Sequence, residues 1–312
     1  KPLLPAPDAA AAALARDFLK EYMAGEAAPN ALFAGRLTQA PEQLPPLEGV
    51  RTLRVGLQLG EARGKLFVPD HALALAVPCQ RAWPLEEAAA HPEAVRLALE
   101  GGRVGVTLPR VCWDREREEL RRQLAVVRDL GVTDALVGTL DLIAPAREAG
   151  LALRGDFGLN IFNSASAQVA RELKLASATL SFEMTLPQIR DISKAVNMEL
   201  IAYGRLPLMI TEQCLIKNKT GECACQSGVP VKLTDKTGAD FPVMKEADTC
   251  RSVLLNGKKL YWLDRQNDLA KLGLWAIRLN FTTENAREVD RVLEEYLVPT
   301  SFDPGACTRG LY

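Results

Sequence analysis

The chain has 312 residues, of which 48% are hydrophobic and 25% are charged, and its formal net charge is −1. This composition is typical of a globular protein with one large or two ordinary domains. The charge excludes an overall basic surface of the kind that binds nucleic acid through charge alone, and the lack of a long apolar run predicts no membrane-spanning helix.

The first part, residues 1–101, is predicted to be a smaller α+β segment. It is rich in Ala and Pro at its start, where a helix is expected at 9–23, and two strand-like runs follow at 52–59 and 73–77. The N-terminus has no starting Met and no export signal, and the chain has seven cysteines. We therefore expect a part of a longer, cytoplasmic protein, with this segment as the tail of a preceding region.

From residue 102 onward, strands and helices alternate, which predicts an α/β fold with a parallel sheet or barrel. The expected strands are 104–108, 135–138, 153–162 (interrupted by glycines), 178–182, 198–203 and 274–280; the expected helices are 114–130, 140–149, 163–173, 185–195 and 284–297. We expect residues 102–312 to form a TIM-like barrel, complete or incomplete. An antiparallel β insert is expected at about 214–262, with hairpins at Lys236–Gly238 and at the Asn256-Gly257 pair.

Functional side chains in α/β proteins gather at the carboxyl ends of the strands. The candidates by this rule are Asn160, Asn163, Glu183, Tyr203, Arg205, Arg278 and Asn280. We select Glu183, Tyr203 and Arg205 as candidate catalytic residues. A buried glutamate, Glu183 or Glu199, is expected to act as a general base or to form an ion pair with Arg205. No Ser-His-Asp arrangement and no phosphate-binding glycine motif is present.

Four of the seven cysteines, Cys214, Cys223, Cys225 and Cys250, fall within 37 positions of one another. Thiolates bind zinc and iron–sulfur clusters, so one interpretation is a shared metal centre. Disulfides and free thiols are the alternatives. In the metal interpretation the centre also holds the β insert in place, because an insert of this size buries too little apolar surface to be stable by itself. Cys79, Cys112 and Cys307 are expected to lie outside the site.

The run from Glu199 to Cys214, which contains Tyr-Gly-Arg-Leu-Pro-Leu-Met, the later cysteines and the terminal Thr-Arg-Gly-Leu-Tyr resemble the collagenase-like proteases, peptidase family U-32. The resemblance extends over about residues 102–312 and implies the C-terminal portion of a long family member. It implies a peptidase-type enzyme, and several members of the family support oxygen-independent hydroxylation of RNA or of a small molecule.

The resemblance also implies that Cys214, Cys223, Cys225 and Cys250 hold a [4Fe–4S] cluster. Because only one residue separates Cys223 from Cys225, a tetrahedral zinc site remains open as an alternative. The expected partners are preceding domains of the same polypeptide and an RNA or protein substrate. The alternative function is a non-catalytic, substrate-binding module with structural zinc.

Overall fold

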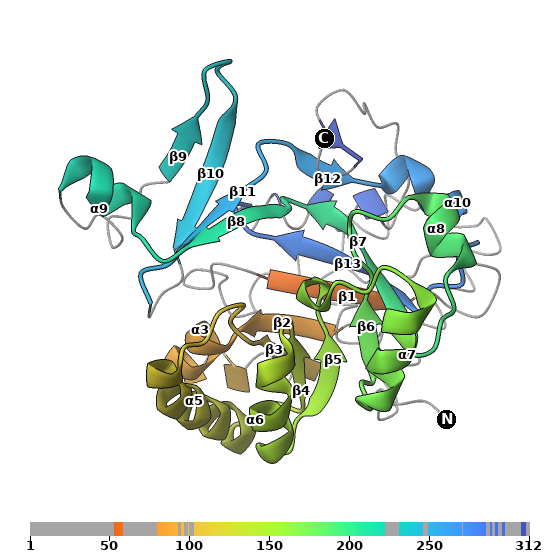
Figure 1. Ribbon diagram of the computed structural model, residues 1–312, viewed down its shortest axis with the longest axis horizontal. Helices are drawn as coiled ribbons and strands as arrows, with labels where there is room; N and C mark the ends of the chain where they lie inside the picture. The colour runs from red at the N-terminus through yellow and green to blue at the C-terminus, as the bar shows by residue number, and fades with distance from the viewer. Residues whose placement is uncertain are drawn as a thin grey trace, which may run out of the picture.

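A computed structural model describes residues 53–58, 80–92, 95–96, 99, 103–221, 231–245, 249–269, 271–284, 288, 291–292, 295–296 and 307–309. Within this part, ten strands form one sheet (Figure 1). Their order is β13 (Ala276–Phe281), β1 (Leu53–Gln58), β2 (Gln80–Pro84), β3 (Arg103–Thr107), β4 (Asp134–Val137), β5 (Ala152–Gly155), β6 (Ser177–Thr179), β7 (Asn197–Gly204), β12 (Lys259–Tyr261) and β14 (Cys307–Thr308).

The sheet is mainly parallel, which confirms the expected α/β class. Strands β2 to β7 pair in parallel with one another, whereas β1 is antiparallel to both β2 and β13, and β12 is antiparallel to β7. Strand β13 pairs with β1 on one side and, in parallel, with β7 on the other. Eight of these strands, in the order β1, β2, β3, β4, β5, β6, β7 and β13, are each paired with the next, and the last of them, β13, also pairs with the first, β1.

Helices pack on the outside of these strands (Figure 1): α3 (Leu85–Ala90), α5 (Arg117–Asp129), α6 (Ile143–Glu148), α7 (Ser164–Glu172), α8 (Leu186–Asp191) and α10 (Gln266–Leu269). Helix α5 forms because Leu120, Leu124 and Val127 recur on one face and are buried there. It ends where Gly131 adopts a positive φ of 99°. None of the helices in the described part is long and apolar enough to cross a membrane.

The glycine-interrupted strand expected at 153–162 ends at Gly155, and a short 3₁₀ turn, Phe157–Leu159, follows. The chain turns at Gly158, where a Cβ atom would lie 2.5 Å from the carbonyl oxygen of Gly138. Only glycine permits this approach of the loop after β5 to the loop after β4. Ile161 then pairs with Leu180 through an isolated bridge.

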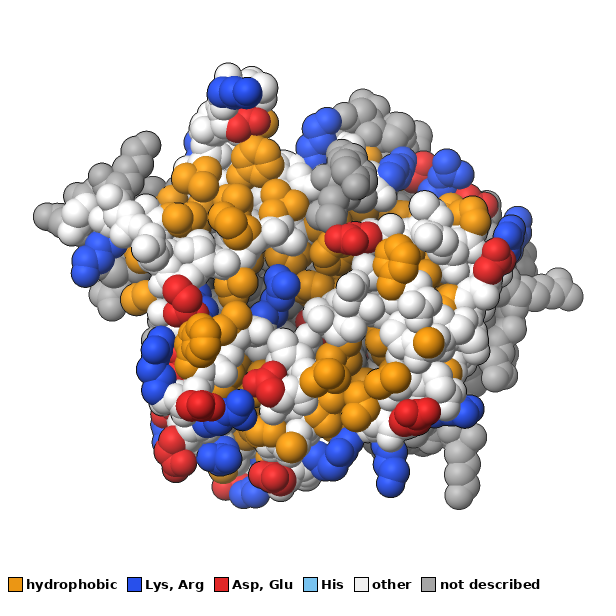
Figure 2. Space-filling view, in the orientation of Figure 1, with side chains coloured by type: hydrophobic (Ala, Val, Ile, Leu, Met, Phe, Trp, Pro, Cys, Tyr) orange, Lys and Arg blue, Asp and Glu red, His pale blue; other side chains and the backbone are white. Residues whose placement is uncertain are grey.

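The expected antiparallel insert is a separate four-stranded sheet in the order β8 (Pro207–Thr211), β11 (Ser252–Leu255), β10 (Asp240–Lys245) and β9 (Val231–Thr234), with α9 (Leu215–Thr220) after β8. It projects from the main body (Figure 1). Apolar side chains gather on its surface (Figure 2), where Leu208, Met209 and Leu233 are exposed.

The hairpin at Lys236–Gly238 is confirmed, because β9 and β10 pair directly. The prediction of a second hairpin, at Asn256-Gly257, is wrong. Strand β11 pairs with β8 and β10, whereas β12 pairs with β7 and β14. The Asn-Gly pair is instead the crossover between the two sheets, and contacts from outside the pair hold it: the Asn256 N–H donates to the Leu206 carbonyl at 2.8 Å.

Strands β1 and β2 precede residue 102 but belong to the same sheet as the strands after it. The main sheet therefore begins before the expected boundary. The assignment of residues 1–101 to a preceding region and of 102–312 to the U-32-like part remains a prediction, and the helix expected at 9–23 lies outside the described residues.

Candidate functional site

Tyr203, expected to be catalytic, lies at the end of β7 and is 1% exposed. Its hydroxyl donates to Glu284 Oε1 at 2.9 Å, and Lys259 Nζ lies 2.7 Å from the same oxygen. Burial, followed by the nearby charge of Glu284, raises the pKa of Tyr203. Burial acts to raise the pKa of Glu284, but the hydrogen bond and charge of Lys259, with the hydrogen bonds from the Thr282 N–H and Tyr203, together outweigh it, so the pKa is lowered. The arrangement is a neutral phenol that donates to an ionised carboxylate inside the protein.

Arg205, the second candidate, lies on the loop after β7. Its Nη1 donates to the carbonyl oxygen of Asn256 at 2.9 Å and also to that of Gly257, and its Nε donates to Thr283 Oγ1 at 3.3 Å. Arg205 therefore holds the crossover between the two sheets, and within the described residues it forms no ion pair with a glutamate.

The glycine between these two residues is required by the backbone. Gly204 has a φ of +120°, and a Cβ atom there would lie 2.0 Å from the carbonyl oxygen of Asn280 on β13. Any side chain would force β7 and β13 apart. This explains the middle residue of the Tyr-Gly-Arg segment.

Glu183, the third candidate, is exposed on the loop after β6, and within the described part no hydrogen bond or ion pair joins it to Tyr203 or Arg205. Asn160 adopts a left-handed conformation with a φ of 51° after β5. The side chain of Asn163 accepts from Ser166 N at 2.9 Å and caps α7, as its place in the sequence predicts. The catalytic roles of Glu183, Tyr203 and Arg205 stay predictions.

Several strands of the main sheet carry buried charged side chains that contact one another. Arg154 Nε contacts Asp134 Oδ1 at 2.9 Å, with side-chain exposures of 3% and 0%. Arg278 on β13 donates to Glu199 on β7, and its Nη1 lies 3.6 Å from Asp156 Oδ1. Ser177 connects the two pairs, because it accepts from Arg154 at 3.2 Å and donates to Glu199 at 2.7 Å. One polar network therefore runs across β4, β5, β6, β7 and β13.

Two cysteines of the expected metal centre lie at one end of the insert sheet. Cys214 follows β8 and Cys250 precedes β11, and these strands pair so that Thr211 lies opposite Ser252. The Leu215 N–H donates to Ser252 Oγ at 3.3 Å, which brings the segment after β8 beside β11. The Cys214 sulfur accepts from Lys217 N at 3.4 Å, and Cys250 has a left-handed φ of 57°. Both are free thiols.

Cys223 and Cys225 lie outside the described residues, as does Cys79. Within the described part, no group of three or more His, Cys, Asp or Glu could hold a metal ion. The expected four-cysteine centre thus stays a prediction. Cys112 and Cys307, expected outside the centre, are half-buried free thiols on the loop after β3 and on β14.

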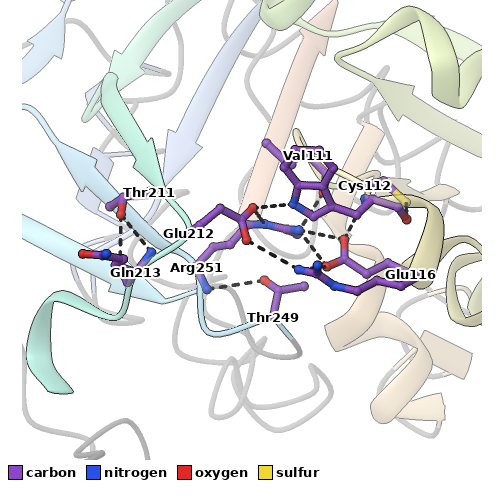
Figure 3. Close-up of polar contacts among 10 residues, drawn as sticks. Val111, Cys112, Glu116, Thr211, Glu212, Gln213, Thr249 and Arg251 are labelled. Atoms are coloured by element: carbon purple, nitrogen blue, oxygen red, sulfur yellow. Dashed lines mark hydrogen bonds and ion pairs between the residues drawn. The ribbon is translucent and has the colours of Figure 1, made fainter. Parts of the chain in front are cut away.

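A buried arginine joins the cysteine-bearing end of the insert to the main body (Figure 3). Arg251 Nε donates to Glu212 Oε1 at 2.5 Å, its Nη1 donates to the Val111 carbonyl at 3.0 Å, and its Nη2 lies 2.7 Å from both carboxylate oxygens of Glu116. Trp113 Nε1 donates to the same oxygen of Glu212 at 2.8 Å. The loop after β3 and the ends of β8 and β11 therefore meet around one guanidinium.

Sequence analysis did not select Arg251, Glu116 or Trp113. A weak signal for Arg251 was its place directly after Cys250, because residues next to expected ligands often orient them. Glu116 lies 135 positions from Arg251, and it belongs to an Arg/Glu-rich run that reads as a solvated helix face. Nothing in a single sequence pairs residues at such a separation.

Two family models match the chain. The model of the first C-terminal domain of the RsmF rRNA methyltransferase matches residues 16–77, of which 53–58 are described. No curated protein matches the chain significantly. The model of peptidase family U32 matches residues 86–298, which extend from α3 through the insert to beyond β13 and make up well over half of the sequence. By this match, the chain belongs to peptidase family U32.

Proposed function

We propose that this chain is the U32 portion of a larger enzyme that acts on RNA through a metal centre bound by four cysteines. The observation that carries the proposal is the place of Cys214 and Cys250. They lie in the two segments that flank the same end of the β8–β11 pair, and Arg251 attaches that end to the loop at the carboxyl end of β3. Sites of α/β proteins gather at this edge of a parallel sheet.

Cys214, Cys223, Cys225 and Cys250 would hold the metal. The two described cysteines fit this role because both are free thiols, the form from which a thiolate ligand is made. A [4Fe–4S] cluster at this place would supply one-electron chemistry for hydroxylation without oxygen. A zinc ion would supply structural stabilisation or Lewis acidity.

We propose that the eight strands from β1 to β13 form a TIM-like barrel in which β1 is reversed. The double pairing of β13 supports this arrangement. In it, the exposed Glu183 would face substrate at the carboxyl edge, whereas Tyr203 and Arg205 would position the backbone of that edge through Glu284 and the crossover carbonyls.

The RNA substrate class is supported by the match of residues 16–77 to a domain of an rRNA methyltransferase. The preceding domains of the same polypeptide would then hold the RNA, and the protein would act in the cytoplasm. Peptide hydrolysis, in contrast, is supported only by the name of the family.

The alternative function is a non-catalytic module with structural zinc that helps a preceding domain to hold its substrate. The burial of Tyr203, at 1% exposure, favours this alternative, because a side chain so deeply buried does not touch substrate.

The test is purification of the full chain without oxygen, followed by incubation with RNA, a reductant that keeps the cluster in its active redox state, and an organic oxygen donor that gives up one oxygen atom and is itself reduced by two electrons. The product is examined by mass spectrometry for an added oxygen atom. We expect a cluster-bearing chain whose product is lost in Cys214→Ser and Cys250→Ser and kept in Cys307→Ser. A chain that holds zinc and has no turnover supports the alternative. A chain that holds no metal in any form overturns both readings.

A further inference from the structure

Arg251 is the largest of the fully buried side chains in the described residues. A buried arginine is costly unless its charge is balanced and its donors are used. Burial opposes the charge, but the hydrogen bonds that the guanidinium donates to Glu116 and then to Glu212, with the charges of these carboxylates, together outweigh it and raise the pKa of the guanidinium. The group is therefore a permanent cation fixed between two carboxylates.

These contacts come from three separate segments. Val111 and Glu116 lie on the loop and 3₁₀ turn after β3, Glu212 lies directly after β8, and Arg251 itself lies directly before β11. Glu116 is held in turn by the Trp113 backbone N–H, which donates to its Oε2 at 2.9 Å. The contact with Glu116 uses both of its oxygens, and such a two-point contact fixes direction as well as distance.

The same anchor fixes both cysteines of the insert end. Cys250 is one residue from Arg251, and its left-handed backbone is a conformation that a non-glycine residue keeps only when its surroundings hold it. Arg251 N donates to Thr249 Oγ1 at 3.5 Å across Cys250. Cys214 lies two residues after Glu212, the second partner of the guanidinium. Displacement of Arg251 would therefore release the two backbone segments that carry Cys250 and Cys214.

We propose that Arg251 is a positioning residue, which fixes the Cys214 and Cys250 thiols relative to the carboxyl edge of the parallel strands. The inference rests on the proposed metal site. Outer partners of this kind orient metal ligands, and their loss typically lowers metal affinity by about 10–100-fold. Arg251 acts through Cys250 and Cys214 and does not itself bind the metal.

The test compares Arg251→Met, Arg251→Lys and Glu116→Gln in the full chain. Arg115→Met is the matched control, because Arg115 is 72% exposed and approaches the same two carboxylates only to 3.7 and 3.8 Å. The first readout is Zn²⁺ affinity under reducing conditions, measured by competition with a coloured chelator. We expect about 10–100-fold weaker binding in Arg251→Met, a smaller loss in Arg251→Lys and Glu116→Gln, and no change in Arg115→Met.

A second readout does not depend on metal. The alkylation rates of Cys214 and Cys250, with Cys307 as internal reference, are measured by peptide mapping in the metal-free chain. We expect both rates to change several-fold in Arg251→Met and neither to change in Arg115→Met. If the wild type binds no Zn²⁺ but these rates change, the proposed metal site is wrong and the positioning stands. A lower Tm with unchanged rates and unchanged affinity makes Arg251 merely structural and overturns the inference.

Discussion

Replacement of Arg278 by Met tests whether the buried network holds the sheet together. Arg278 on β13 and Glu199 on β7 are 3% and 1% exposed, and their ion pair lies where β13 joins β7. Without the guanidinium, Glu199 keeps the hydrogen bond that Ser177 donates to it at 2.7 Å. A buried carboxylate would then be left without a counter-charge.

Removal of one partner from a buried pair typically costs about 3–5 kcal/mol, because the other charge stays desolvated. That is a large fraction of the total stability of a domain, which is about 5–15 kcal/mol. At about 2–4 °C per kcal/mol for domains of 150–250 residues, the expected fall in Tm is about 6–20 °C. The double variant Arg278→Met with Glu199→Gln should recover part of this loss, because Glu199 then carries no unpaired charge. Asp156, which lies 3.6 Å from Arg278 Nη1, still loses that cation, so the recovery is not complete.

The assay is thermal and urea unfolding followed by circular dichroism. Lys232→Met is the matched control, because the Lys232–Asp240 pair is exposed at 61% and 44% and should contribute little. If Arg278→Met were as stable as the wild type, or if the double variant were less stable than the single one, the reasoning about the buried charge would be refuted.

Three further predictions follow from single features. Gly204→Ala should destabilise the chain by about 2–5 kcal/mol or prevent folding, because its Cβ would meet Asn280 O at 2.0 Å; a Tm within 2–3 °C of the wild type, measured by calorimetry, would contradict this. Asn163→Ala should lower the free energy of unfolding, measured with urea, by about 1 kcal/mol, because the cap of α7 is lost. Asn163→Asp should keep most of this stability, because aspartate also caps helices. In an alkaline titration followed at 295 nm, three tyrosines should stay protonated until the protein unfolds. Burial raises their pKa values in the folded state above the ordinary tyrosine value of 10.0. The unfolded state therefore binds fewer protons above that pH, and stability should fall as the pH rises. The three buried tyrosines are Tyr203, Tyr261 and Tyr296. Ionisation of all five tyrosines of the chain near pH 10 in the folded protein would contradict this prediction.

The alternation of strands and helices after residue 102 was predictable, because their apolar periods and caps are local. Helix α5 repeats Leu120, Leu124 and Val127 on one face, and Asn163 marks the start of α7. The membership of β1 in the main sheet was not predictable from local pattern. Its two antiparallel neighbours, β2 and β13, are set by pairings between distant segments.

The candidate site was predictable only in part. The cysteines and the polar strand ends could be selected by residue type, but their environment could not. The Asn256-Gly257 pair has the sequence of a hairpin turn, yet Arg205 and Leu206 hold it as a crossover between two sheets. Tyr203 has the chemistry of a catalytic residue, yet it packs inside the protein against Glu284. In each case a tertiary contact outweighs the local signal.

The most direct test of the account is a metal count on the full chain purified without oxygen, alongside Cys214→Ser, Cys250→Ser and Cys307→Ser. The account predicts stoichiometric iron with sulfide, or zinc, in the wild type and in Cys307→Ser, and a large loss in the other two variants. A wild-type chain that contains no metal and whose four cysteines, Cys214, Cys223, Cys225 and Cys250, all react rapidly as free thiols would contradict it.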